Sequence, residues 1–411
     1  MYRLNTIVPG LITLIMVVAS CNTDFKPVDN PLAIDGKDDY SKTKLTTKTV
    51  PDWAEMLRHD SGWIGADGIY CTNLNGVDKP GQMNDASETM FWFSDCIIGT
   101  IDTKADTLQG KWQMMNNSVA YFKGADPDPA AIQYFWRKDS AGNPLSMFEP
   151  TTPKSQPGYY YWLGDGFMNH AKDSTIYIFA YLVRNVPGSI FPFEDLGVSL
   201  IALPKGSRPP FEQQKQYDTP LFFTNEKGKP VFGIAVLPNT AGAGAPRPDG
   251  YIYVYGVRGG NKELLVARVQ DSQFEDFSQW RYWDGFGWNT DPNACAALTD
   301  NISNEMSVSF MADGRVIAAY QPKSNGTSAV VVAAGATPWG PFQPAKKVWE
   351  TPESYDDLDF YTYNAKGHPN LSKPGEILIS YNVNSFDFLD DIVKHPYHLR
   401  PRFISVKYAA Q

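Results

Sequence analysis

The segments VFGIAVLPN (231–239), GYIYVYGVRG (250–259) and ELLVARVQ (263–270) decide the fold class. Each is a short apolar run rich in branched and aromatic residues, and Gly or Pro stands in the turns between them. Such runs are typical of β-strands, and strands that follow one another at this spacing pair as antiparallel neighbours. With a fourth run at QWRYWDG (279–285), these residues predict one four-stranded antiparallel sheet.

Four further groups of strands repeat this order on either side, in residues 65–138, 159–219, 305–350 and 360–409. The repeat is irregular, on the order of 60 to 80 residues, and four antiparallel strands per repeat are typical of a propeller blade. We therefore predict an all-β, five-bladed β-propeller. The last group has only three strands, and a segment upstream of Asp67 is expected to supply the fourth, because an open blade would leave an unpaired edge. The alternative, a pair of β-sandwiches, does not readily explain five sheets of matching order.

The composition limits the classes of ligand. The chain has 411 residues with 36 Lys and Arg against 45 Asp and Glu, which gives a net charge of −9 and leaves no basic surface for nucleic acid. Aromatic residues make up 14% and charged residues only 20%. An acidic, aromatic-rich protein suits a neutral polyhydroxylated ligand, because sugar CH faces stack on rings and hydroxyls bond to carboxylates and amides.

The first residues are typical of a targeting signal. Arg3 precedes the apolar run IVPGLITLIMVV (7–18), and the following VVASC resembles the lipobox of bacterial lipoproteins. This resemblance implies cleavage before Cys21, a diacylglycerol group on its sulfur, and a lipid anchor in the outer membrane of a Gram-negative bacterium, on the periplasmic or cell-surface side. A transmembrane anchor is the alternative, but the run is short for a span. We thus expect a signal peptide at 1–20, a tether at 21–50 with polar and Pro-rich composition, and one propeller domain at 51–411, in which PDWAEMLRH (51–59) is the one short helix.

Three cysteines remain, and we expect them to be buried thiols. The strand register proposed for the first blade leaves Cys71 and Cys96 several residues out of alignment, and the spacing with Cys295 does not match a zinc cluster. The sequence requires no cofactor. It is compatible with a structural calcium or sodium ion in the propeller channel.

Two aspartates in the first hairpin are the leading catalytic candidates. If Asp67 pairs near Asp95, then Tyr70 and Cys71 lie beside Phe91 and Trp92, and both carboxyl groups are at one end of one hairpin. Glycosidic bond cleavage needs two such acids, one to donate a proton and one to activate water or attack the sugar. The alternative is that Asp67 serves the turn before Gly68 and Asp95 bonds a loop backbone.

Further acids come from other blades. The first strands of propeller blades line a central channel, which opens onto a funnel where ligands bind. Glu305, at the start of SNEMSVSF (303–310), could reach across this funnel as a general acid, although an acid at a strand start is commonly solvent-exposed. Asp165 follows aromatic residues in YYYWLGDGFMNH (159–170) and could contact a sugar, whereas GDG is also ordinary turn chemistry.

Other polar residues near strand ends are candidates for binding substrate. Amides could bond sugar hydroxyls or cap loops, histidines could contact a ligand or be core residues bonded to backbone, and arginines could hold an acid ionised or brace ring closure. The candidates are Asn117, His170, Asn364, His368, Asn382 and Arg400.

A series of motifs carries a family resemblance. They stand in this order: ADGIY, FWFSDCIIG, NNSVAYF, WLGDG, YIYVYG, LLVARV, WRYWDGFGW, SNEMSVSF, TPWGPF, YNAKGHPNLS, LISYNVNS and RPRFISV. Together, over roughly residues 60 to 408, the chain resembles a family of bacterial five-bladed propellers long catalogued as a domain of unknown function, whose characterised members include endo-acting D-arabinanases. It is similar in fold to the arabinanase/xylosidase and neoagarooligosaccharide hydrolase families. The resemblance implies glycan hydrolysis in the funnel with acids at Asp67 and Asp95 and, with less weight, Glu305; Cys96 departs from the small polar residue expected after Asp95.

The sequence thus predicts an extracytoplasmic glycoside hydrolase, a monomer whose partners are a glycan, arabinan-type or another, and the outer membrane. Asp67 is expected to act as base or nucleophile, with Asp95 orienting it or sharing its proton and Glu305 as general acid. Two alternatives stay open: a non-catalytic surface glycan-binding lipoprotein, which needs no acid pair, and a structural propeller that scaffolds a partner. Function depends on the site rather than on the fold.

Overall fold

The computed structural model describes residues 44–187, 192–322, 328–356 and 359–408. The predicted signal peptide, Cys21 and residues 21–43 of the predicted tether lie outside these ranges. The described chain is nearly all β, which confirms the predicted class. Its three short α-helices are α1 (Pro51–Met56), α2 (Glu353–Asp356) and α3 (Phe388–Lys394). Within the described ranges, no helix combines the length and the apolar character that a bilayer span requires.

Five antiparallel sheets, here sheets I to V, follow one another along the chain and correspond to the five predicted groups of strands. Sheet I has the order β3 (Tyr70–Asn73), β4 (Glu88–Phe93), β7 (Ser118–Lys123), β8 (Ile132–Phe135). Sheet II has β11 (Tyr160–Asn169), β12 (Thr175–Asn185), β13 (Phe193–Leu203), β14 (Lys215–Asp218). Sheet III has β15 (Val231–Asn239), β16 (Tyr251–Arg258), β17 (Glu263–Gln270), β18 (Arg281–Trp283), β19 (Trp288–Asn289). Sheet IV has β20 (Ser307–Phe310), β21 (Val316–Tyr320), β22 (Ala329–Gly335), β23 (Lys346–Glu350).

Sheet V contains both ends of the described chain. Its order is β1 (Leu45–Thr49), β26 (Arg402–Tyr408), β25 (Glu376–Ser385), β24 (Phe360–Gly367). Strand β1 pairs antiparallel with β26, from Leu45 opposite Tyr408 to Thr49 opposite Ile404. A segment upstream of Asp67 therefore supplies the missing fourth strand, as predicted. The same finding corrects the predicted tether at its end, because residues 45–49 form a strand. Their alternation of Thr and Lys is polar, but an outermost strand needs few apolar residues.

The run MFWFSDCIIGTI, predicted as one strand, is divided between two sheets. Strand β4 ends at Phe93 in sheet I, and β5 (Cys96–Asp102) joins a separate three-stranded sheet in the order β2 (Ser61–Ala66), β5, β6 (Thr107–Met115). The partner strand divides at the same level, between Ala66 and Tyr70. A long apolar run in the sequence does not reveal such a change of sheet, because both halves are buried and extended. Two short strands, β9 (Arg137–Lys138) and β10 (Pro144–Leu145), form a hairpin nearby.

The remaining short helices are single 3₁₀ turns between strands. They are η3 (Pro129–Ala131), η4 (His170–Lys172), η5 (Asp271–Gln273), η6 (Phe277–Gln279), η7 (Pro292–Ala294) and η8 (Pro369–Leu371).

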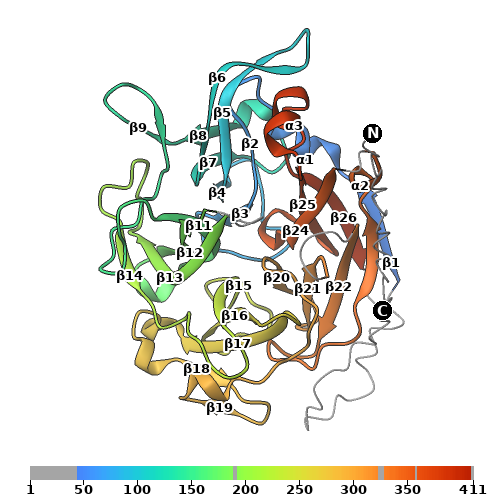
Figure 1. Cartoon of the computed structure of the whole chain (residues 1–411). Coiled ribbons are helices and arrows are strands. Elements are labelled where there is room, and N and C mark those ends of the chain that lie inside the picture. The colour runs from blue at the N-terminus through green and yellow to red at the C-terminus, as the bar shows by residue number, and fades with distance from the viewer. Residues whose placement is uncertain (1–43, 188–191, 323–327, 357–358, 409–411) are drawn as a thin grey trace, which may run out of the picture.

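The first strands of the five sheets gather in the middle of the molecule. Figure 1 shows the sheets following one another around a common centre, and β3, β11, β15, β20 and β24 contact one another in chain order. Three of these inner strands, β11, β15 and β24, change register at a bulge. Bulges redirect side chains and let backbones approach. At one of them a side chain on residue 164 would meet the Gly233 carbonyl oxygen at 2.8 Å, so only Gly fits there.

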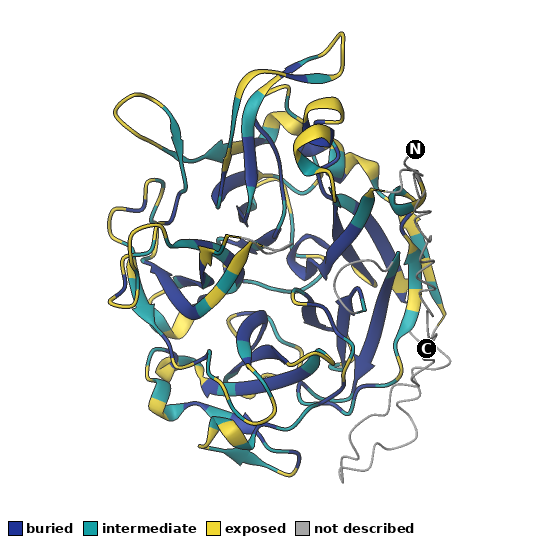
Figure 2. Ribbon diagram, viewed as in Figure 1, coloured by how far each residue is buried: buried dark blue, intermediate teal, exposed yellow. Residues whose placement is uncertain are grey.

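Most hydrophobic clusters of the described chain are shared by neighbouring sheets, and one lies between the β2–β5–β6 sheet and α3. One cluster joins sheets I and II, the next sheets II and III, and others sheets III and IV and sheets IV and V. The cluster around Trp53 and Met56 of α1 contains Phe91 from sheet I and Phe403 from sheet V, so the last sheet packs against the first. In Figure 2 the inner strands are buried along most of their length, while the outer strands carry the exposed residues. Because the inner strands are buried along their length, their polar side chains gather at the strand ends, where they can form a site.

Candidate active site

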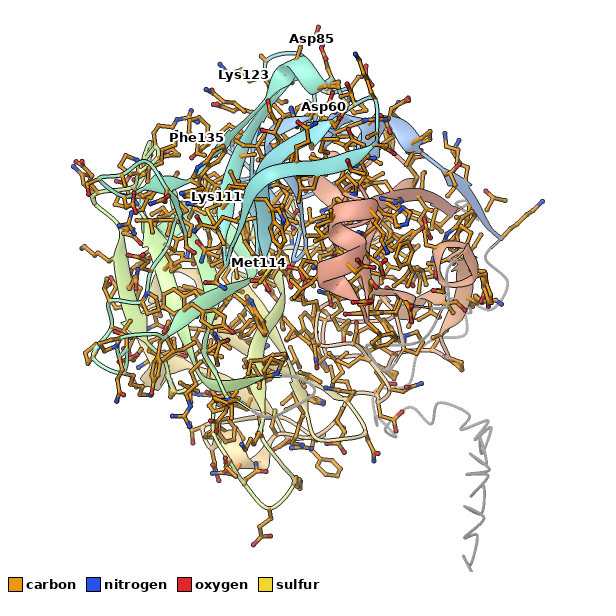
Figure 3. The ribbon with its side chains drawn as sticks, turned by 45° about the horizontal axis from the view of Figure 1, so that its top comes forward. Asp60, Asp85, Lys111, Met114, Lys123 and Phe135 are labelled. Carbon is orange, nitrogen blue, oxygen red and sulfur yellow. The ribbon has the colours of Figure 1, made fainter. Side chains whose placement is uncertain are left out.

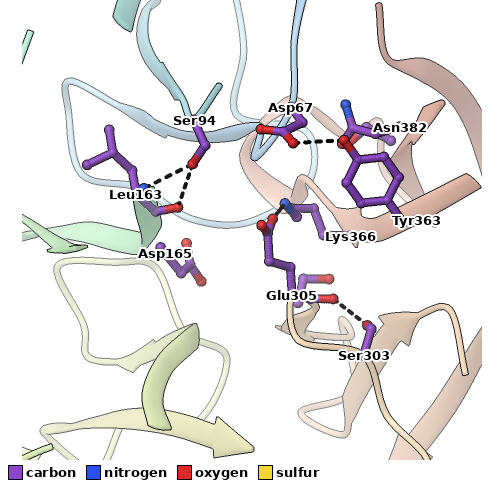
Figure 4. A network of polar contacts seen from close by, with 12 residues as sticks. Asp67, Ser94, Leu163, Asp165, Ser303, Glu305, Tyr363, Lys366 and Asn382 are labelled. Atoms are coloured by element: carbon purple, nitrogen blue, oxygen red, sulfur yellow. Dashed lines mark hydrogen bonds and ion pairs between the residues drawn. The ribbon is translucent and has the colours of Figure 1, made fainter. Parts of the chain in front are cut away.

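A cavity of about 630 Å³ opens among sheets I, II, III and V and the start of sheet IV. Acidic, aromatic, amide and lysine side chains line it together. The acids include Asp67, Asp95 and Glu305, the three predicted catalytic candidates. The structure therefore brings these three side chains to one cavity, and Figure 4 shows Asp67 and Glu305 approaching it from two different elements.

The predicted first hairpin has the expected register. Tyr70 is opposite Trp92 and Cys71 opposite Phe91. Beyond these pairs the Asp67 amide donates to the Asp95 carbonyl at 3.1 Å, and the Ser94 amide donates to the Asp67 carbonyl at 2.9 Å. The two aspartates are thus held in direct backbone contact at the point where both strands leave sheet I.

The turn that carries Asp67 is clamped by close packing. Gly68 has a φ of +57°, and a side chain there would meet Ser94 Oγ at 2.6 Å. The same Ser94 hydroxyl accepts from the Leu163 amide at 2.9 Å, and Figure 4 shows it pointing at β11. On the other side Asn382 Nδ2 donates to the Ala66 carbonyl at 3.1 Å. The backbone of Asp67 is therefore fixed by sheets II and V.

The Asp67 carboxyl group accepts a hydrogen bond from the Tyr363 hydroxyl at 2.7 Å. Burial raises the pKa of Asp67 well above its usual value, and the neighbouring Asp95 and Glu305 raise this pKa further. The Tyr363 hydrogen bond and the Lys366 ammonium oppose this change. Near neutral pH the group therefore retains a proton far more readily than a free aspartate does.

Asp95 receives two side-chain donors on one oxygen. Trp162 Nε1 donates at 2.9 Å and Asn116 Nδ2 at 3.3 Å. Burial raises the pKa of Asp95 to about 6, and these two hydrogen bonds limit the increase. Because Asp67 and Asp95 repel each other when both are charged, they titrate as a pair that binds one proton more tightly than the second.

Glu305 forms an ion pair with Lys366. The Lys366 side chain is only 2% exposed and that of Glu305 16%, so the pair is largely excluded from water. The ammonium also lies 3.9 Å from the centre of the Tyr70 ring. The Lys366 ammonium can only donate hydrogen bonds, so it occupies the Glu305 carboxyl group with a donor and draws it toward β24. The general-acid role of Glu305 stays a prediction.

A second, small cavity of about 30 Å³ lies deeper among the inner strands and is lined by Asp78, Asp165 and His368. Asp165, predicted to bind substrate, has its carboxylate bonded to the Val236 amide at 2.6 Å and the Gly166 amide at 2.8 Å. Burial raises its pKa to about 7. It lies beside this inner space and not on the wall of the large cavity, and its hydrogen bonds hold the β11 bulge against β15.

His368 also lies in this inner region. Its Nε2 is 2.7 Å from Ser380 Oγ, its Nδ1 is 3.5 Å from Cys71 Sγ, and it is buried. Burial, and then Lys366, lower its pKa to about 3, so the ring is neutral. His368 is therefore a core residue that does not line the large cavity, and its ring contacts two side chains rather than the backbone that the alternative interpretation expected.

The other predicted binding residues divide between the cavity and the framework. Asn364 lines the cavity. Asn117 is fully buried and donates to the Phe148 and Tyr161 carbonyls at 3.0 Å each, so it holds the segment around Phe148 against β11. His170 follows β11 at the end away from Trp162 and is exposed. Asn382 holds the Ala66 carbonyl rather than facing the cavity.

Arg400 is likewise outside the cavity. Its guanidinium is 3.5 Å from Glu55 of α1 and stacks 4.4 Å above the Tyr397 ring. Burial and then Arg402 lower its pKa to about 10. It joins the N-terminal helix to the last sheet, as the ring-closure alternative proposed.

Several cavity residues were not singled out from the sequence. They are Trp162, Tyr181, Lys229, Lys262, Tyr361 and Tyr363 in the large cavity, and Lys366 in the small one. A usable signal existed for some of them, since Trp162 and Tyr363 belong to inner strands and stand close to the predicted residues Asp165 and Asn364. Lys229 and Lys262 stand in connections between strands, where a charged residue is ordinary and carries no signal.

The three cysteines of the described part of the chain are free thiols. Cys71 donates to Asn370 Oδ1 at 3.3 Å, and Cys96 and Cys295 are buried in the core. In the described ranges, no cluster of three or more His, Cys, Asp or Glu side chains is arranged to hold a metal ion.

Two comparisons with known proteins concern this chain: one shows a shared fold and the other shows the family. The crystal structure of a "putative hydrolase" from Bacteroides ovatus superimposes with a TM-score of 0.66 at 19% identity, covering 92% of this chain and 96% of that chain. This similarity shows a common fold. Residues 51–408 match the family described as "Domain of unknown function (DUF5005)", and the chain belongs to this family.

Weaker structural similarities were also found. They include the exo-beta-1,3-galactanase from Phanerochaete chrysosporium (TM-score 0.47, 9% identity, 88% of this chain and 64% of that chain). They also include the levansucrase from Gluconacetobacter diazotrophicus (TM-score 0.47, 10% identity, 84% of this chain and 78% of that chain). A search of curated proteins found no match.

Proposed function

We propose that this protein is a glycoside hydrolase built on a five-bladed β-propeller, with sheets I to V as the blades. The shared clusters between consecutive sheets, and between the last and the first, support this architecture. The function rests on one observation: Asp67 and Asp95, in backbone contact, line a large cavity together with Glu305. Two neighbouring buried carboxyl groups with raised pKa values, beside a third that is ion-paired with a lysine, are the kinds of group that glycosidic bond cleavage requires.

The geometry supports a division of roles that differs from the sequence prediction. Burial raises the pKa values of both Asp67 and Asp95, which favours a pair with one protonated member, and in this proposal that member donates to the glycosidic oxygen. The ionised member activates water or attacks the sugar. Glu305, ion-paired with Lys366, stabilises the positive charge that develops on the sugar ring. The anomeric form of the first product, read by NMR, distinguishes attack by water from attack by a carboxylate.

Aromatic side chains on both sides of the acids fit a sugar ligand. Trp162 bonds Asp95 and stacks edge-on against Phe193, whose ring centroid is 4.6 Å away. The ring centroid of Tyr361 lies 5.5 Å from that of Tyr363 and 4.6 Å from that of the exposed Phe386. Ring faces next to carboxylates suit the CH faces and hydroxyls of a saccharide.

The substrate screen that tests this proposal begins with arabinan-type polymers, the substrates implied by the family resemblance, and continues with plant and algal glycans. The purified protein is expected to release reducing ends from at least one of them. Asp67→Asn and Asp95→Asn are each expected to lower turnover at least about a hundredfold, the scale of general acid–base catalysis.

The matched control for these variants is Asp85→Asn, because Asp85 is an exposed aspartate on a peripheral loop (Figure 3). Full activity in Asp67→Asn would contradict the assignment. Glycan binding without turnover, unchanged by both cavity variants, would instead identify a non-catalytic glycan-binding protein.

The location of the protein is also part of the proposal. Cleavage before Cys21 and acylation of its sulfur would attach the propeller to the outer membrane through residues 21–43. The anchored protein is proposed to be a monomer. Metabolic labelling with a fatty-acid analogue, lost in Cys21→Ala, tests this anchor.

A further inference from the structure

The wall of the large cavity formed by sheet III carries two lysines. Lys229 and Lys262 both line the cavity that contains Asp67, Asp95 and Glu305. The protein as a whole is acidic, with a net charge of −9. A cationic wall is therefore a local feature of the site and does not reflect a generally basic surface.

Two turns are packed together to place these lysines. Gly228 immediately precedes Lys229, and a side chain on residue 228 would meet the Gly259 Cα atom at 3.3 Å. Gly259 begins the β16–β17 turn that ends in Lys262. The two turns therefore lie against each other, and both ammonium groups reach the same cavity.

Lys262 occupies an unusual backbone conformation. Its φ is +54°, in the left-handed region where Gly or Asn is usual and a larger side chain is strained. The preceding residues are Gly259, Gly260 and Asn261, which all tolerate this conformation better. A lysine at a strained position in a cavity wall points to a function for its side chain.

Neither lysine is neutralised by an ion pair. Among the described residues, no carboxylate lies within ion-pair distance of either ammonium, whereas Lys366, which lines the small inner cavity, is paired with Glu305. The facing acids are Asp195, which acts on both lysines at longer range, and Glu194, which is bound by Arg184 at 2.6 Å. Burial lowers the pKa of Lys262, so its ammonium is partly removed from water.

Lys262 also stands next to the candidate catalytic groups. Its Nζ donates to Asn304 Oδ1 at 2.5 Å, and Asn304 directly precedes Glu305. The ammonium has two more protons to donate. A ligand group bound there would lie beside the residue that faces the reacting sugar.

We propose that Lys229 and Lys262 form a subsite for a negatively charged substituent, so that the substrate is an acidic glycan carrying a carboxylate or a sulfate ester. That this glycan is cleaved rests on the proposed function. That the two lysines bind its anionic group does not depend on that function. Two ammonium donors in a partly desolvated wall bind such a group by charge-assisted hydrogen bonds. Neutral glycans of the same backbone would leave both lysines without an anionic partner.

The test uses the Asp67→Asn protein as a binding form and compares three probes by calorimetry. They are polygalacturonate for carboxylate, a sulfated galactan for sulfate ester, and arabinan as a neutral glycan. We expect one of the two acidic probes to bind, and Lys229→Met and Lys262→Met each to weaken its binding about ten- to a hundredfold. The matched control is Lys227→Met, on the same turn but outside the cavity wall, which is expected to leave binding unchanged.

Lys262→Arg retains the charge and is expected to restore most of the binding, which separates an electrostatic role from a loss of folding. The outcomes for this subsite and for the hydrolase are distinct. Binding of an acidic glycan that depends on the two lysines, without turnover by the unmodified protein, supports the subsite and contradicts the hydrolase. Turnover of a neutral glycan unaffected by the lysine variants supports the hydrolase and overturns the subsite. Absence of binding to both acidic probes also overturns it.

Discussion

Removing the Tyr363 hydroxyl tests the electrostatics of the acid pair directly. This hydroxyl donates to Asp67 at 2.7 Å and is the largest single contribution that opposes the raised pKa of Asp67. A hydrogen bond to a charged group contributes about 1.5–3 kcal/mol. Since one pKa unit corresponds to about 1.36 kcal/mol, Tyr363→Phe is expected to raise the pKa of Asp67 by about 1–2 units.

Two measurements report this shift. The limb of the pH profile of kcat/KM that the pair governs is expected to move to higher pH by about 1–2 units, as a property of the pair rather than of one residue. Thermal unfolding reports it without a substrate. Because the pKa of Asp67 is higher in the folded than in the unfolded state, this residue lowers stability as pH rises from about 4 to its folded pKa, and the loss is constant above it.

In Tyr363→Phe this loss extends to higher pH. The difference in Tm between wild type and variant should therefore widen as the pH rises through the folded pKa of Asp67 in the wild type, and become constant above the folded pKa in the variant. Tyr361→Phe is the control, because Tyr361 lines the same cavity and its hydroxyl is not bonded to Asp67. A difference in Tm that is the same at every pH, or an equal shift in the Tyr361 variant, would refute the reasoning.

Two further predictions concern the ion pair and the closure of sheet V. Glu305→Gln leaves the buried Lys366 ammonium without its partner, and denaturant unfolding is expected to show a loss of about 3–5 kcal/mol, largely restored in Glu305→Gln/Lys366→Met. A single variant as stable as wild type would show that Lys366 does not depend on Glu305. A chain that begins at residue 50 lacks β1 and exposes the edge of β26. Compared with a chain that begins at residue 44, its free energy of unfolding should be lower by on the order of 3 kcal/mol, because a few backbone hydrogen bonds are lost. It should also aggregate more readily, because the edge is unpaired. Equal stability of the two chains would show that β1 does not secure the closing sheet.

Much of the fold could be predicted because its signal is local. Apolar runs such as residues 231–239 and 250–259 have the length and the β-branched and aromatic composition of buried strands, and Gly or Pro separates them. The pairing of Asp67 with Asp95 could be proposed from the sequence because both belong to one hairpin of consecutive strands, although the long connection of residues 74–87 does not fix its register. The division of residues 90–101 between two sheets could not, because the same buried, extended residues fit either partner.

The candidate site depends on contacts between distant parts of the chain. Glu305 is bound to Lys366, and Asp67 to Tyr363, which lies 296 positions further along. In the sequence, His368, Asn382 and Arg400 resemble Asn364, since each is polar and near a strand end, yet only Asn364 faces the cavity. The difference lies in the bulge of β24 and in the packing around it, which decide where each side chain points.

The sequence alone therefore determined the strands, their order and the two acids of the first hairpin. These depend on residue type and on neighbours a few positions away. The tertiary structure decided which further groups surround those acids, that Glu305 is ion-paired with Lys366, and that two lysines share the cavity. These depend on five sheets meeting at their inner strands, where burial and opposing charges from separate sheets combine in ways that no local pattern contains.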